Sequence, residues 1–181
     1  MMGLGIAEIG HFTLALAFGT ALVMAIVPII GATRPEHNAL GDRLMQTGRL
    51  AAGLMLGQIA LAFTLLTVSF LTSDFSVKLV ASHSHSLKPM IYKFAGVWGN
   101  HEGSLLLWAL ILAIFSSAVA WSRRINPRRQ AWVLSIQGMI AVAFLLFLLV
   151  TSNPFLRLDA APLDGNGLNP LLQDIGLALH P

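Results

Sequence analysis

Four long apolar segments restrict this chain to a small set of folds. At a rise of 1.5 Å per residue, about 20 residues cross the roughly 30 Å hydrocarbon core of a bilayer. The sequence predicts an all-α integral membrane protein with about four transmembrane helices, at residues 9–30, 50–71, 105–121 and 132–150. The third of these segments is at the short end of the range, and we expect it to extend back through Gly103 and Ser104.

The sparse charge of the chain supports lipid as its main solvent. Only 10% of the 181 residues are charged and 56% are hydrophobic, whereas a soluble domain is about one quarter charged. A sequence pI near 10 is compatible with nucleic-acid binding, but the basic residues gather in two short inter-helix loops, so no nucleic acid is expected. The chain has no cysteine and offers no thiol chemistry of its own.

The arginines predict how the chain is oriented. Cytoplasmic loops are enriched in Lys and Arg. Seven arginines fall in the first and third loops: Arg34, Arg43, Arg49, Arg123, Arg124, Arg128 and Arg129. The N-terminus, the loop at 72–104 and the tail at 152–181 together contain four basic residues: Lys78, Lys88, Lys93 and Arg157. We therefore expect both termini outside the cytoplasm. The domains would be a transmembrane region at 1–151 with an outer loop at 72–104, and an extracytoplasmic segment at 152–181.

Two histidines in the outer loop are a candidate metal pair. The stretch from Ser73 to Val80 alternates apolar and polar residues, as a strand or an amphipathic surface segment does. His83 and His85 follow, and in an extended chain their side chains would point to one side. A solvated polar turn is the favoured interpretation, because no carboxylate or Cys is near in sequence.

A His-Glu pair between two tryptophans is the stronger candidate site. His101 and Glu102 lie between Trp98 and Trp108, where a polar loop becomes an apolar segment. His101 would act as a ligand or proton carrier tuned by Glu102. The alternative is that Glu102, Gly103 and Ser104 cap the third helix, because a carboxylate near a helix N-terminus favours its dipole.

The C-terminal stretch contains signs of order. Asn169-Pro170 is typical of an N-cap followed by proline at the first helical position, and predicts a short apolar helix that ends at His180-Pro181. In the second span, Gly53 and Gly57 form a pair that allows close helix approach.

Several blocks together resemble a known family. They are Ser73 to Val77 with Val80 to Ser84, Trp98 to Trp108, Thr151 to Phe155, and Leu168 to Asp174 with His180-Pro181. In this order they resemble the N-terminal part of the CcmF family, the membrane component of cytochrome c haem lyase. Related nitrite-reductase assembly proteins are similar.

The resemblance implies a role in attaching haem b to apocytochrome c. In the family, haem arrives on the chaperone CcmE, CcmH/CcmI-type subunits take part in the lyase, and the thiols of a CxxCH motif are joined to the haem vinyl groups. His180 matches the first of two histidines that flank the family's tryptophan-rich haem loop, which implies an axial haem ligand. His101, Trp98 and Glu102 are further candidates for haem contact.

The family's tryptophan-rich loop and second flanking histidine do not occur in these 181 residues. We therefore expect a truncated chain or one product of a split gene, inactive without the remaining part of CcmF. The expected location is a bacterial inner membrane with the N-terminus periplasmic, or a mitochondrial inner membrane.

Two other function classes stay open. One is a membrane scaffold that docks assembly partners. The other is a proton- or ion-translocating subunit with His101 and Glu102 as a relay. No Lys, Asp or Glu lies mid-span, where such carriers are usually needed, which disfavours the second class.

Overall fold

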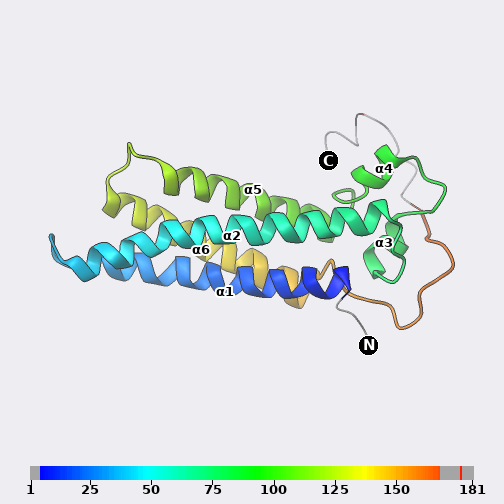
Figure 1. Cartoon of the computed structure of the whole chain (residues 1–181), viewed down its shortest axis with the longest axis horizontal. Coiled ribbons are helices and arrows are strands. Elements are labelled where there is room, and N and C mark those ends of the chain that lie inside the picture. The colour runs from blue at the N-terminus through cyan, green and yellow to red at the C-terminus, as the bar shows by residue number, and fades with distance from the viewer. Residues whose placement is uncertain (1–4, 168–175, 177–181) are drawn as a thin grey trace. The chain divides into compact units, whose positions relative to one another are not determined.

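Helices account for most of the computed structural model, which describes residues 5–167 and Gly176. Within this part of the chain, four helices are long and apolar enough to cross a membrane: α1 (Ile6–Ala32), α2 (Ala39–Leu71), α5 (His101–Trp121) and α6 (Pro127–Val150). Two short helices, α3 (Lys78–His83) and α4 (Met90–Ala95), lie between α2 and α5 (Figure 1). The expected helical membrane fold with four long apolar helices is therefore observed.

The chain forms two compact units, each of which takes part of every long helix. The loop unit comprises the described residues within 1–13, 61–108 and 148–181, and it contains α3 and α4. The arginine unit comprises residues 14–60 and 109–147, and it contains the seven arginines from which the orientation was predicted.

All four long helices begin earlier than the hydropathy pattern predicts. Three of them, α2, α5 and α6, start directly after an asparagine whose side-chain oxygen accepts a backbone N–H of the first turn. Asn38 accepts from Gly41 at 2.9 Å, Asn100 from Gly103 at 2.7 Å, and Asn126 from Arg128 at 2.9 Å. Such N-caps satisfy donors that the helix itself leaves unpaired.

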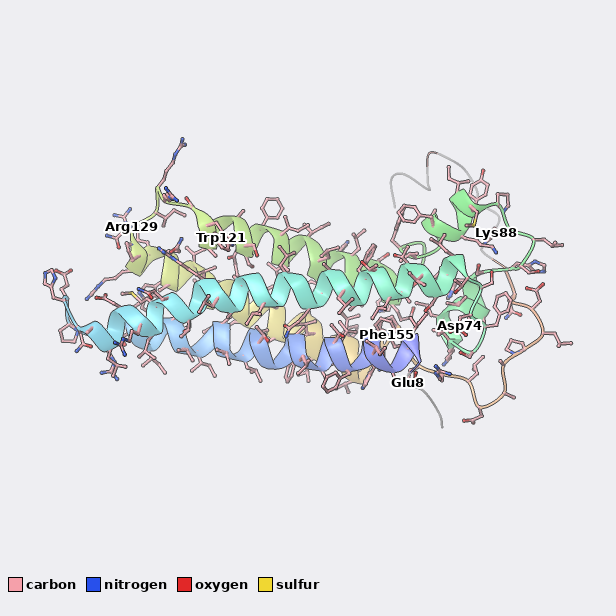
Figure 2. All side chains as sticks on the ribbon, viewed as in Figure 1. Glu8, Asp74, Lys88, Trp121, Arg129 and Phe155 are labelled. Atoms are coloured by element: carbon pink, nitrogen blue, oxygen red, sulfur yellow. The ribbon has the colours of Figure 1, made fainter. Side chains whose placement is uncertain are left out.

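The earlier starts change the setting of four residues that we expected in loops. Arg43 and Arg49 lie in α2, while Arg128 and Arg129 lie in the first turn of α6. Hydropathy locates only the apolar part of each helix, whereas the helix itself begins at its N-cap, several polar residues earlier. Figure 2 shows Arg129 and Trp121 at the end of the arginine unit where α5 gives way to α6.

A buried glutamine joins three helices of the arginine unit. The side chain of Gln130 is 2% exposed. Its amide nitrogen lies within hydrogen-bond distance of three carbonyls at the end of α5, those of Val119 (2.6 Å), Ala120 (3.1 Å) and Ser122 (3.2 Å). Its oxygen accepts from Nε of Arg49 in α2 at 2.6 Å. Gln130 therefore satisfies carbonyls that the C-terminus of α5 leaves unpaired.

The expected glycine contact on α2 does not occur among the described residues. A Cβ atom added at Gly53 or Gly57 would have no heavy atom within 4 Å. Close contacts in this unit occur at Gly31 of α1, where an added Cβ would come within 2.7 Å of the Gly41 carbonyl oxygen in α2, and at Gly138 of α6, where it would come within 2.6 Å of the backbone nitrogen of Ala25 in α1. Glycines at other positions than 53 and 57 therefore allow the close helix approach.

In the loop unit, the stretch from Ser73 to Val80, predicted as a strand or an amphipathic segment, is a turn followed by the start of a helix. Val77 forms one isolated antiparallel bridge with Arg157, and α3 begins at the next residue. The N–H of Lys78 donates to the Leu156 carbonyl at 2.8 Å, and the N–H of Leu158 donates to the Ser76 carbonyl at 2.9 Å. The alternating pattern thus yields a single point of pairing with the segment that follows α6.

Candidate functional site

The start of α5 forms a fixed platform for the His-Glu pair. The side chain of Asn100 caps the helix and also donates through Nδ2 to the Gly96 carbonyl at 2.7 Å. The hydroxyl of Ser104 donates to the Trp98 carbonyl at 2.6 Å. Two carbonyls of the loop before α5 are therefore hydrogen-bonded to side chains at the start of the helix. The alternative raised from the sequence was that Glu102, Gly103 and Ser104 cap α5, whereas the side chain that accepts a first-turn N–H is that of Asn100.

An apolar groove with a cavity volume of about 470 Å³ lies at this platform. Trp98, His101, Leu105 and Trp108 line it, together with Gly99, Asn100 and Ser104. The ring of Trp98 meets that of Phe94 edge to face, with centroids 4.8 Å apart. Binding sites for drug-sized ligands occupy about 300–1,000 Å³ and are mostly apolar with few polar groups. The groove has these properties and one imidazole on its wall.

Glu102 lines a different cavity from His101. This smaller cavity, of about 100 Å³, is formed by Glu102 with His83, Lys78 and Asn153, among others. Successive helix residues are rotated by about 100°, which accounts for the separation of two sequence neighbours. The structure thus brings Trp98, His101 and Trp108 into one groove and places Glu102 with His83.

The two loop histidines have separate partners. Nδ1 of His83 lies 3.1 Å from the Leu79 carbonyl within α3. Nε2 of His85 lies 3.5 Å from a carboxylate oxygen of Asp164. No group of three or more His, Cys, Asp or Glu side chains suited to a metal ion occurs among the described residues.

The carboxylate of Asp164 was not found from the sequence, because its partners lie far away along the chain. Ser86 donates to it through its hydroxyl at 2.5 Å and through its backbone N–H at 2.9 Å. These bonds, led by the hydroxyl bond and assisted by the Gly165 N–H and the nearby His85, lower the pKa of Asp164 to about 2.

The segment after α6 is held against the loop between α2 and α5. The N–H of Asn166 donates to the Ala81 carbonyl at 2.8 Å, and that of Gly167 donates to the Ser84 carbonyl at 3.0 Å. Only glycine fits at Gly165, because an added Cβ would collide with the Ser84 carbonyl oxygen. These contacts hold the backbone in place as far as Gly167.

At the other end of this segment, the side chains return to α1. Nδ2 of Asn153 lies 2.7 Å from Nδ1 of His11, and Nε of Arg157 lies 2.7 Å from the Glu8 carboxylate. Phe155 fills the space beside Gly10, and Figure 2 shows Phe155 and Glu8 near the start of α1. His180, the candidate axial ligand, lies outside the described residues, as does the predicted helix from Asn169-Pro170 to the C-terminus except for Gly176, which is helical.

These features define a class of protein, a helical membrane protein with four long apolar helices and a folded loop unit. A family model described as "Cytochrome C assembly protein" matches residues 98–181, a range that begins at Trp98 of the groove. The chain is similar to this family, and its match to the CcmF/CycK proteins lies in their N-terminal quarter.

Three relatives show the extent of the match. The cytochrome c-type biogenesis protein ccl1 of Rhodobacter capsulatus is 54% identical over 177 residues, which cover 97% of this chain and 26% of that protein. CycK of Rhizobium meliloti is 50% identical, with 97% and 25% covered. CcmF of Escherichia coli is 48% identical, with 96% and 26% covered. The chain spans about a quarter of the length of these relatives.

A solved structure has the same fold. The structure named "Cytochrome c Heme Lyase CcmF" matches with a TM-score of 0.76 at 22% sequence identity, covering 86% of this chain and 25% of that one.

Proposed function

We propose that this chain is the N-terminal part of a cytochrome c haem lyase component and takes part in the covalent attachment of haem to apocytochrome c. The observation that carries the proposal is the groove at the start of α5, whose indole rings and single imidazole suit a flat, mainly apolar tetrapyrrole. Haem is the substrate here and supplies the reactive vinyl groups, while the chain holds and orients it.

Within this function, His180 is the proposed axial ligand. The resemblance to the family supports this role, because His180 matches the first of the two histidines that flank the family's tryptophan-rich haem loop. Trp98 and His101 are proposed to contact the macrocycle in the groove. Glu102 lines the other cavity, and we assign it to the N-terminus of α5, where a carboxylate favours the helix dipole.

The proposed location is an inner membrane, with both ends and the loop unit on the outer side. The arginines support this orientation, because the arginines of α2 and α6 lie together in the arginine unit and bind other residues of the same unit. Nη2 of Arg128, for example, donates to the Arg34 carbonyl at 2.7 Å. The proposed partners are the remaining part of the protein, CcmE, CcmH/CcmI-type subunits and apocytochrome c. In the variant Ser122→Cys, reaction of the thiol with a membrane-impermeant reagent added on the outer side would contradict this orientation.

Complementation of a strain that lacks the lyase tests the proposal. The chain is expressed alone and then with a second chain that carries the rest of the protein, and cytochrome c is detected by its covalent haem stain. We expect rescue only with both chains, provided that both are inserted. Failure of inserted pairs to rescue would contradict the proposed function.

Histidine variants in the rescuing pair separate the roles. His180→Ala is expected to abolish covalent haem and His101→Ala to lower it, at unchanged membrane levels. His37→Ala is the matched control, since His37 lies in the arginine unit between α1 and α2, and it should rescue fully. Full rescue by His180→Ala would favour the scaffold function instead.

A further inference from the structure

Helix α4 turns its apolar side outward. Three large apolar side chains of this helix are exposed, and we call them the outward face of α4: Met90 (61% exposed), Ile91 (52%) and Phe94 (44%). Leu87, in the turn before the helix, is also exposed (87%). Single exposed apolar residues are normal in proteins, whereas a contiguous group marks an interaction site.

The cations of the same stretch point inward. Lys93 is 7% exposed, and its ammonium group donates to the hydroxyl of Ser73 at 2.7 Å. The ammonium group of Lys88 donates to the His83 carbonyl at 3.1 Å, and burial, followed by the charge of Lys93, lowers its pKa to about 8. Residues 87–99 contain no Asp or Glu. A short helix in water is expected to turn its apolar side chains inward and its charged side chains outward, which is the reverse of this arrangement.

The outward face continues onto a membrane-spanning helix. Phe94 packs edge to face against Trp98, which shares the groove with Leu105 and Trp108. Trp108 is 59% exposed and belongs to α5, a helix long and apolar enough to span. The apolar surface thus runs from α4 through two indole rings to the side of a span.

We propose that the outward face of α4 lies in the interface of the lipid bilayer, so that α4 is an in-plane anchor for the loop between α2 and α5. The continuity with α5 favours lipid as the occupant, because the bilayer that surrounds the span reaches the adjoining surface. Tryptophans are enriched at this depth, and amphipathic helices lie there with their apolar side immersed. The uncharged face indicates that the interface is recognised through its apolar character.

The test uses the natural absence of cysteine. A nitroxide is attached to Ile91→Cys in the whole chain, reconstituted in phosphatidylcholine vesicles. Its collisions with oxygen, which concentrates in lipid, are compared with those of a water-soluble nickel chelate. The matched control is Leu163→Cys, since Leu163 is an apolar residue of the same unit and is fully exposed.

We expect a higher oxygen-to-nickel accessibility ratio at position 91 than at position 163. Equal ratios would place α4 in water and overturn the proposal. Protection of position 91 from both agents would mean that protein covers α4, which would overturn it as well. If the Ile91 variant loses its helical circular dichroism, Met90→Cys replaces it. The measurement does not depend on haem, so its outcome is separate from that of the complementation test.

Discussion

Replacing Asn100 tests whether the start of α5 is set by one side chain. In Asn100→Ala, the Gly103 N–H loses its acceptor and the Gly96 carbonyl loses its donor, both at 2.7 Å. Loss of an N-cap costs about 1 kcal/mol, and loss of one further net hydrogen bond costs about 1 kcal/mol. We therefore expect local opening of the first turn of α5 to become easier by about 2 kcal/mol, or roughly thirtyfold.

Hydrogen exchange of the Gly103 amide measures this change in the reconstituted chain, with an amide in the middle of α6 as the internal reference. Asn100→Asp is the control, because its carboxylate keeps the capping oxygen and loses only the donor to the Gly96 carbonyl. Its expected effect is about 1 kcal/mol, or roughly fivefold faster exchange. Unchanged exchange at Gly103 in Asn100→Ala would refute the assignment of Asn100 as the cap.

Three further predictions concern stability and titration. Gln130→Leu leaves the last carbonyls of α5 without their donor and should lower the free energy of unfolding by roughly 2–4 kcal/mol in a mixed-micelle titration; an unchanged midpoint would contradict the role of its amide. Ser86→Ala removes the leading hydrogen bond to Asp164, so the carboxyl pKa should rise from about 2 towards 3.8 in a carbon-13 NMR titration. Since the folded pKa is depressed, the stabilisation by Asp164 is present above pH 3.8 and should be lost as the pH falls towards 2, and a pH-independent stability would count against it. Gly138→Ala should destabilise by about 1–3 kcal/mol because its Cβ meets the backbone of α1, whereas the control Gly53→Ala, with open space around it, should not; equal effects would refute the packing argument.

The four spans could be predicted from hydropathy because each apolar run is long and free of charge. The helix starts were harder to predict, since they depend on capping side chains in polar sequence. Asn126-Pro127 has the N-cap and N1 pattern that we recognised at Asn169-Pro170, and the same criterion would have found the start of α6. The asparagine before each of α2 and α5 carries the same information.

The candidate site was predictable only in part. Trp98, His101 and Trp108 share a groove because helical spacing and a tight loop bring neighbours together. The separation of His101 from Glu102 depends on which side of α5 each residue faces, which an apolar helix with little periodic contrast does not reveal. The contact of Ser86 with Asp164 joins residues 78 positions apart, and no local pattern encodes it.

The position of Gln130 has a consequence for how the last two long helices hold together. Its amide reaches three carbonyls at the end of α5 from the first turn of α6, so the partners that the C-terminus of α5 needs are supplied within the α5–α6 pair. The end of α5 therefore does not rely on α2 for these bonds, because Arg49 binds the side-chain oxygen of Gln130 instead.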